Sequence, residues 1–276
     1  MDTWSDARIV SLKGQGVKAF LQGYLTCNSD RIRQNAPTPT TLCNLKGRVI
    51  ANGWAIGDDE CVLLVVHHSV AVALAAFLKP YAMFSKCSVE AHNHAVAVAS
   101  SASGSNSFTD HWCFADNLLD ASQSNADDQS SAIARDLVTN RFAWVSDGVA
   151  GKFLPQVLGL HEVGAVDFDK GCYLGQEIVA RAQFRGAVKR GIDVFEWHGQ
   201  LPMAGDDWTD SAHGKGMVIF VRDCFHSLSD DEQALYEKLL DWEDVDLYDL
   251  LQGRITSDDP LVSGLVEKII SYDGVL

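Results

Sequence analysis

Residues 170–190 read KGCYLGQEIVARAQFRGAVKR, and their spacing predicts a tight turn followed by a charged helix. From residue 175 onward the apolar positions recur as they do at the start of a helix. Four charged residues then stand four positions apart on one predicted helix face: Glu177, Arg181, Arg185 and Lys189. One carboxylate followed by three cations suits a ligand with a polar ring at one end and carboxylates at the other.

The turn before this helix carries further groups that would bind a ligand. Gly171 and Gly175 would allow close approach to the backbone, and free amides at a helix start bind anions. Cys172 lies between Lys170 and the helix start, and both favour a thiolate. A simpler interpretation stays open: the charged column would be a solvated helix face with one ordinary ion pair, and Cys172 would be a packing residue.

The sequence before the motif mixes strand and helix patterns. Residues 7–14 alternate like a strand, residues 15–25 have helical spacing, and residues 44–66 predict a hairpin that turns at 57–59. Residues 69–84 predict a helix halted by Pro80. The pattern predicts an α+β fold, since regular βαβ repetition is missing.

Other segments are less regular. Residues 163–168 suggest a strand leading into the motif, and residues 99–131, rich in Ser, Asn and Asp, predict a loop with a short element inside. Residues 191–205 and 214–221 predict two short strands. Residues 222–276 predict a small all-helical module, with a capping box that starts at Ser229.

Charge is unevenly distributed along the 276 residues, whose net charge is −15. Residues 206–276 hold 17 acidic and 5 basic residues, a net −12, which leaves −3 for residues 1–205. We therefore expect no nucleic acid partner, although the nearly neutral first part leaves room for a local anion site. The apolar runs predict no membrane insertion.

The cysteines and histidines suggest neither disulfides nor a metal site. Seven scattered cysteines without a CxxC pair, and no export signal at the start of the sequence, fit a cytoplasmic protein. The pairs His67–His68 and His92/His94 lack companions at metal-ligand spacing, so we expect a structural role for each and no metal.

The motif resembles the signature of the YgfZ-type folate-binding proteins, relatives of the glycine-cleavage T protein (aminomethyltransferase) that act in iron–sulfur cluster assembly and repair and are linked to tRNA modification. Supporting matches are FLQGYLT (20–26), CNLKGRVIANG (43–53) and YAMFSKCSV (81–89). The resemblance covers about residues 7–200 and implies a T-protein-like folate-binding platform that binds tetrahydrofolate. It marks Cys172 as the functional thiol and, together with the charged column, implies these cofactor-binding residues: Lys170, Tyr173, Gly175, Gln176, Glu177, Arg181, Arg185 and Lys189.

The chain departs from the transferase pattern at one decisive place. Transferase relatives carry an Asp-Asp pair where this chain has Ala51-Asn52. Without those carboxylates, aminomethyl transfer loses its expected acid/base group. The resemblance therefore implies folate binding without the transferase reaction.

A second resemblance begins near Cys224. Residues 225–251 are similar to SdhE, the small helical factor that promotes covalent FAD attachment to succinate dehydrogenase, although the RGxxE motif of SdhE is not present. The sequence thus predicts a YgfZ-like region (1–190), a truncated β-barrel remnant (191–221) and an SdhE-like helical module (222–276).

Three functions follow from these resemblances. The first is a folate-binding accessory protein whose partners are iron–sulfur enzymes or their assembly machinery. The second is an assembly chaperone that docks the flavoprotein subunit of succinate dehydrogenase, and both roles can coexist in one chain. The third, an active aminomethyltransferase, is disfavoured by Ala51-Asn52.

Overall fold

The computed structural model describes residues 2–100, 107–109, 111–119, 127–185, 191–192, 194, 207–210, 214–217 and 262. The chain divides into two compact units, residues 1–222 and 223–276. The helices predicted within 222–276 lie outside the described residues, except for Val262, which is helical. The predicted domain boundaries after residues 190 and 221 stay predictions.

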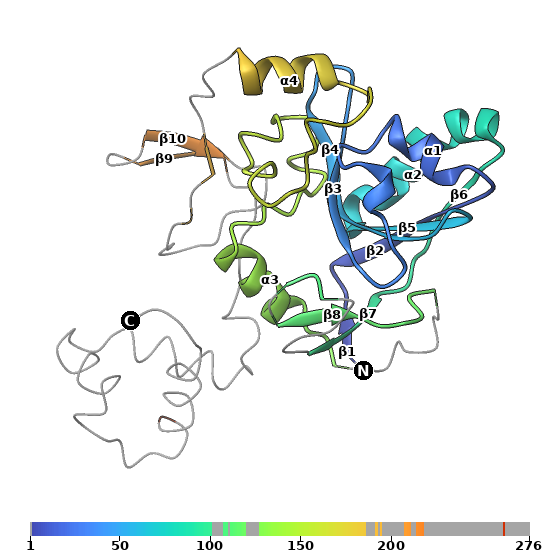
Figure 1. The fold of residues 1–276 in the computed structure, drawn as a ribbon. Coiled ribbons are helices and arrows are strands. Elements are labelled where there is room, and N and C mark those ends of the chain that lie inside the picture. The colour runs from blue at the N-terminus through green and yellow to red at the C-terminus, as the bar shows by residue number, and fades with distance from the viewer. Residues whose placement is uncertain are drawn as a thin grey trace. The chain divides into compact units, whose positions relative to one another are not determined.

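A five-stranded antiparallel sheet forms the centre of the first unit (Figure 1). Its strands, in spatial order, are β3 (Thr38–Cys43), β4 (Val49–Gly57), β5 (Cys61–His67), β2 (Ala7–Lys13) and β6 (Ser88–Ala91). The predicted strand at 7–14 and the predicted β4–β5 hairpin are both confirmed. Gly57 has a φ of 148°, and a Cβ there would lie 2.0 Å from the Cys61 carbonyl oxygen, so the hairpin turn requires glycine.

Helices α1 (Val17–Gln22) and α2 (His68–Ala82) pack on this sheet through a shared apolar core. The prediction that the second helix stops at Pro80 is wrong, because α2 continues to Ala82 and passes into the 3-10 turn η2 (Met83–Ser85). Pro80 removes one backbone donor on the exposed face of the last turn, where water can satisfy the carbonyl left without a partner.

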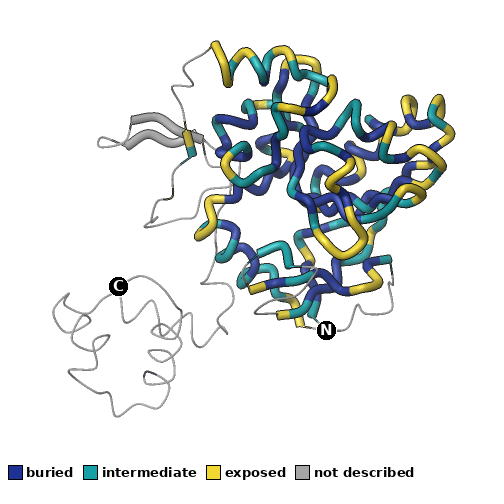
Figure 2. Tube along the Cα trace, viewed as in Figure 1, coloured by how far each residue is buried: buried dark blue, intermediate teal, exposed yellow. Residues whose placement is uncertain are grey.

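A second, three-stranded sheet contains β1 (Asp2–Trp4), β7 (Val96–Ser100) and β8 (Trp112–Phe114). The strand β8 is a short element inside the predicted loop. This sheet and α3 (Ser130–Thr139) enclose an aromatic core in which Trp4 stacks on Trp144 at a centroid distance of 5.0 Å. In Figure 2 the buried residues lie mainly along the strands of the central sheet, and the exposed residues lie in turns and on the outer sides of helices.

The segment from residue 140 to the motif runs as turns, so the predicted strand at 163–168 is wrong. Its backbone groups form hydrogen bonds with segments far away in sequence. For example, the Asp167 amide donates to the Thr26 carbonyl at 3.0 Å, an ordinary hydrogen-bond distance. The motif helix α4 (Gln176–Phe184) follows. The strands β9 (Asp207–Asp210) and β10 (Gly214–Met217) form an antiparallel hairpin, which confirms a strand within 214–221, while most of 191–205 lies outside the described residues.

Candidate functional site

The first residue of the motif is an internal lysine. Lys170 is only 8% exposed, and its Nζ donates to the backbone carbonyls of Gln22, Leu25 and Cys27 at 2.7, 2.6 and 3.0 Å. These bonds use all three hydrogens of an ammonium group. Burial lowers the pKa of Lys170 to about 8. Lys170 therefore fastens the motif to the turn that follows α1.

Two glycines fasten the motif to the loop between β3 and β4. Gly175, with a φ of 81°, lies so close to this loop that a Cβ would be 2.4 Å from the Asn44 carbonyl oxygen. Gly47, with a φ of 68°, faces it from the loop, and a Cβ there would be 3.0 Å from the Cβ of Ile178. Both residues need positive φ and close contact, which only glycine supplies without strain. The importance of Gly47 was not predicted.

The inner face of α4 completes the attachment. Val179 is fully buried in a third apolar core with Val49, Val145 and Leu160. The Gln156 side chain donates from Nε2 to the Val179 carbonyl at 2.8 Å. The predicted start of the helix at Gly175 is confirmed, since Gly175 is its N-cap residue.

The helix amides are less available than the sequence suggests. The Gln176 amide donates to the Tyr173 carbonyl at 3.1 Å, and the Ile178 amide donates to the Gly175 carbonyl at 3.2 Å. The prediction of free amides is therefore wrong for these two positions. The Gln176 side chain also turns inward, and its Oε1 accepts from the Tyr173 amide at 3.3 Å.

The outer face of α4 is open to solvent. Glu177 and Arg181 are exposed and form an i,i+4 ion pair of 3.0 Å. The column of cations is shorter than predicted, because α4 ends at Phe184 and Arg185 is its C-cap, with a φ of −129°. Lys189 lies outside the described residues.

Cys172 differs from the other described cysteines. It is exposed, whereas Cys27, Cys43 and Cys87 are buried, and Cys61 and Cys113 are partly buried. Burial raises the pKa of Cys43 to about 12. Cys172 is thus the described thiol that a solvent-borne reagent or ligand reaches most easily.

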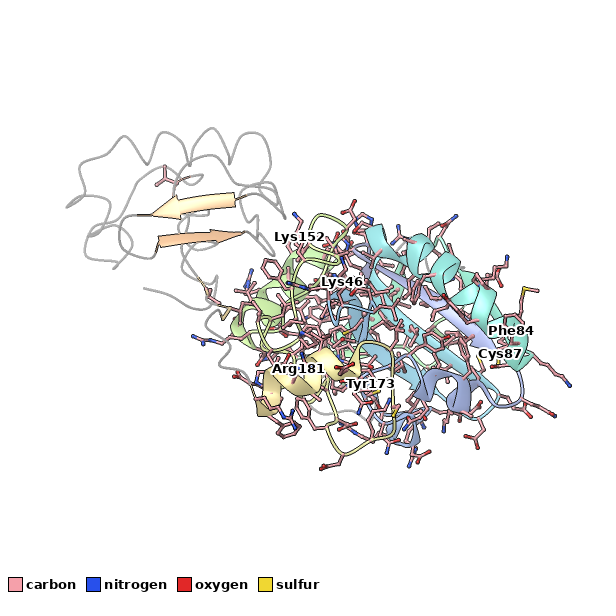
Figure 3. All side chains as sticks on the ribbon, turned by 90° about the horizontal axis from the view of Figure 1, so that it is seen from above. Lys46, Phe84, Cys87, Lys152, Tyr173 and Arg181 are labelled. Atoms are coloured by element: carbon pink, nitrogen blue, oxygen red, sulfur yellow. The ribbon has the colours of Figure 1, made fainter. Side chains whose placement is uncertain are left out.

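Tyr173 is the buried aromatic residue of the motif. It is 7% exposed, its centroid is 5.0 Å from the Lys170 Nζ, and burial raises the pKa of its phenol. Figure 3 labels Tyr173, just before α4, and Arg181, on α4. The structure thus brings together most of the predicted site residues but divides them into a buried group and an exposed group.

Asn52, where the resemblance to the transferases leads us to expect a carboxylate, has a structural role. It is fully buried in β4, donates from Nδ2 to the Ala143 carbonyl at 2.6 Å, and accepts at Oδ1 from the Val145 amide at 2.9 Å. The side chain thereby pairs with the backbone as a neighbouring strand would. Its neighbour Ala51 is also fully buried.

A cavity of about 300 Å³ lies away from the motif, beside the β4–β5 turn. It is lined by residues that include Gln34, Ile56, Asp58, Leu63 and Phe114. None of its lining residues belongs to residues 170–190. In the described part of the chain, no cluster of three or more His, Cys, Asp or Glu residues could hold a metal ion, and no helix is long and apolar enough to cross a membrane.

The fold defines a class of protein. The structure is similar to that of the glycine cleavage system aminomethyltransferase T from Bartonella henselae, with a TM-score of 0.50 and 12% sequence identity. The match covers 66% of this chain and 62% of that one, so this chain spans less than two thirds of the transferase. The first unit thus has an aminomethyltransferase-like α+β fold, as predicted.

The relatives in sequence agree with this fold. Proteins described as tRNA-modifying protein YgfZ, from Serratia proteamaculans and Shigella boydii, are 28% and 26% identical over 73% and 75% of this chain, and over 72% and 74% of their own lengths. An uncharacterised protein of Haemophilus influenzae is 30% identical over 68% of this chain and 70% of its own. Residues 217–273 match the family described as flavinator of succinate dehydrogenase. The chain is thus YgfZ-like over most of its length and carries an SdhE-like segment at its C-terminal end.

Proposed function

We propose that the protein is a folate-binding accessory factor for the assembly or repair of iron–sulfur enzymes, and that it supports tRNA modification through them. Its relatives are described as tRNA-modifying proteins, and its fold is that of an aminomethyltransferase. The observation that carries the proposal is the division of the motif: Lys170 fixes its start to the platform, while Cys172, Glu177 and Arg181 are each exposed to solvent.

These exposed groups fit tetrahydrofolate by their chemistry. The carboxylate of Glu177 can accept from the N–H groups of the pterin ring, and the guanidinium of Arg181 can pair with a ligand carboxylate in a bidentate manner. Arg185, exposed at the end of α4, would extend the same cationic side. Tetrahydrofolate, when bound, would supply one-carbon carrier chemistry, and Cys172 would lie beside it.

A thermal-shift titration tests folate binding. Tetrahydrofolate under anaerobic conditions should raise the melting temperature of the full chain, because a ligand that binds only the folded state stabilises it by about 2.7 kcal/mol at one hundred times its Kd. Arg181→Ala should abolish the rise, and Lys79→Ala, on the exposed face of α2, should leave it intact. No shift in the unmodified protein would overturn the proposal.

The accessory role has its own test. In a strain that lacks the protein, the activity of an iron–sulfur enzyme that modifies tRNA should fall and should return with the unmodified chain. Cys172→Ser should restore less activity than the unmodified chain, because the exposed thiol is lost. Equal rescue by the serine variant would remove the thiol from the proposal. The cytoplasmic location expected from the sequence is part of the same proposal.

A second function is favoured by the match of residues 217–273 to the succinate dehydrogenase flavinator family. We propose that this segment docks a flavoprotein subunit and assists covalent FAD attachment. The full chain should raise the covalent FAD fluorescence of that subunit above the level reached by a chain that ends at Arg222. Equal fluorescence with both chains would contradict this function.

A further inference from the structure

The cavity beside the β4–β5 turn lies where three segments far apart in sequence meet. The first is the tight turn at residues 33–36, the second is the β4–β5 turn with the strand ends beside it, and the third is β8 with the residues that follow it. The Gly57 amide donates to the Arg33 carbonyl at 3.1 Å and joins the first two segments. The volume of about 300 Å³ is that of a small-molecule site.

The buried lining residues of this cavity are apolar. Ile56, Phe114 and Leu118 line it and are nearly fully buried. The Phe114 ring stacks on Phe108 at a centroid distance of 4.1 Å and makes an edge contact with Trp54 at 6.0 Å. An apolar lining of this kind stabilises the apolar body of a ligand by removing it from water.

The charged lining residues are carboxylates. Among the described residues that line the cavity, Asp58 and Asp116 are the charged ones, and no Lys, Arg or His is present. Asp58 is held in place, because its Oδ1 accepts from the amides of Glu60 and Cys61 at 2.9 Å each. Its Oδ2 accepts from the Gln34 Nε2 at 2.5 Å. These bonds keep the pKa of the Asp58 carboxyl below its usual value, so the group is charged at neutral pH.

The cations of the neighbouring elements do not cancel this charge inside the cavity. Lys18 pairs with Asp59 at 3.0 Å, and Arg33 donates from Nη1 to two backbone carbonyls. Lys13 lies on β2, opposite the start of β5, and is not a lining residue, while Glu60 adds a further exposed carboxylate to the turn. The net charge of −15 has the same sign as the lining, so both favour a cationic ligand.

We propose that this cavity binds a small primary amine whose apolar body has about the size of a single ring. The body lies against Ile56, Phe114 and Leu118, and the ammonium donates to the carboxylate of Asp58. An ammonium is favoured over a neutral donor, because a charge-assisted hydrogen bond is about twice as strong as a neutral one. The described lining residues lie outside residues 170–190, so this site is separate from the proposed folate site.

Cys61 lines the cavity and reports on its occupancy. Phenethylamine is the probe, and its binding to the full chain is measured by calorimetry and by iodoacetamide labelling with mass spectrometry. At about ten times its Kd, phenethylamine should slow the labelling of Cys61 about tenfold, because the bound amine covers the thiol. The labelling of Cys172, in the motif, should not change.

Two further probes separate the charge of the ligand from its apolar body. Hydrocinnamate carries a carboxylate in place of the ammonium and should bind at least about tenfold more weakly than phenethylamine. Ethylamine lacks the ring and should also bind about tenfold more weakly. Equal affinities of phenethylamine and hydrocinnamate for the unmodified chain would overturn the proposal.

Asp58→Asn and Asp59→Asn are matched variants of the same turn. Asp58→Asn keeps an oxygen for the two amides but removes the charge, and it should weaken phenethylamine binding about tenfold. Asp59→Asn should leave binding unchanged, because Asp59 does not line the cavity. Equal effects of the two variants, or no binding of phenethylamine to the unmodified chain, would overturn the proposal. Protection of Cys61 by tetrahydrofolate instead of the amine would overturn it as well, since the cavity would then belong to the folate site.

Discussion

The two halves of the motif look equally functional in sequence but have opposite environments in the structure. In the first half, Lys170 and Tyr173 are buried and Gly175 is held against the β3–β4 loop, and Cys172 between them is exposed. In the second half, Glu177 and Arg181 are exposed and touch each other. The difference teaches that the buried residues of the first half position the site, whereas Cys172 and the outer residues of the second half are presented to solvent.

This division predicts that folding stability and ligand binding depend on different residues of the motif. Changes in the first half should reduce the stability of the folded platform, because its groups bond to buried carbonyls or fill a space without room for a Cβ. Changes in the second half should leave stability nearly unchanged and affect ligand binding instead.

Lys170→Met should have the largest effect on stability. Methionine keeps the apolar length of lysine but leaves the carbonyls of Gln22, Leu25 and Cys27 without their donor. We expect a loss of about 4 kcal/mol in the free energy of unfolding, by analogy with the removal of one partner from a buried charged pair. Urea unfolding followed by tryptophan fluorescence measures it. The control Lys79→Met, at an exposed lysine, should change stability by less than about 0.5 kcal/mol. Equal losses in the two variants would show that the three hydrogen bonds of Lys170 add no stability, and would contradict the distinction between the buried and the exposed residues of the motif.

Asn52→Asp extends the same contrast to β4. An ionised aspartate cannot donate to the Ala143 carbonyl, and its charge would be fully buried. We expect a loss of about 3 kcal/mol in the free energy of unfolding. The loss should shrink as the pH falls toward 4, since protonation restores a donor. A fully stable variant would show that the Asn52 side chain is not structural.

Gly175→Ala should lower the free energy of unfolding by less than Asn52→Asp does. Comparison with Gly16→Ala separates the two causes of the loss, which are backbone strain and the contact of the new Cβ. Both glycines begin a helix at positive φ, 81° for Gly175 and 88° for Gly16, but a Cβ at Gly16 meets nothing within 4 Å. Gly16→Ala should therefore lose about 1 kcal/mol from backbone strain alone. Gly175→Ala should lose about 1 kcal/mol more, because its Cβ meets the Asn44 carbonyl. The same urea titration measures the loss of stability in both variants. Equal losses would mean that the β3–β4 loop moves to accommodate the added methyl group without a loss of stability.

Sequence patterns predicted what depends on neighbours along the chain. The β4–β5 hairpin and the start of α4 follow from turn residues and apolar spacing, and both are confirmed. The irregular turns at 163–168 were missed, because their backbone partners lie far away in sequence, as Thr26 does for Asp167. The same limit hid the three carbonyls around Lys170. A lysine in a motif suggests a ligand, and only tertiary structure shows that its donors are used internally.

Thiol labelling should separate the exposed part of the site from the interior without altering stability. In the native protein, Cys172 should react with iodoacetamide much faster than the buried Cys27 and Cys43. Because burial raises the pKa of Cys43 to about 12, its reaction should stay slow until the pH approaches that value or the protein unfolds. Mass spectrometry of the labelled peptides checks the order. Comparable rates for Cys172 and Cys43 would place Cys172 in the interior and contradict the division of the motif.

The Glu177–Arg181 pair should contribute least to stability. Glu177→Gln, Arg181→Ala and the double variant form a mutant cycle that isolates the interaction between the two side chains. The side chains are 81% and 63% exposed, so water screens their attraction and the coupling should stay below about 0.5 kcal/mol. Each single variant should nevertheless lose the tetrahydrofolate shift, since each removes one half of the proposed recognition. A large coupling with an unchanged shift would make the pair a structural element, and the second half of the motif would then resemble the first.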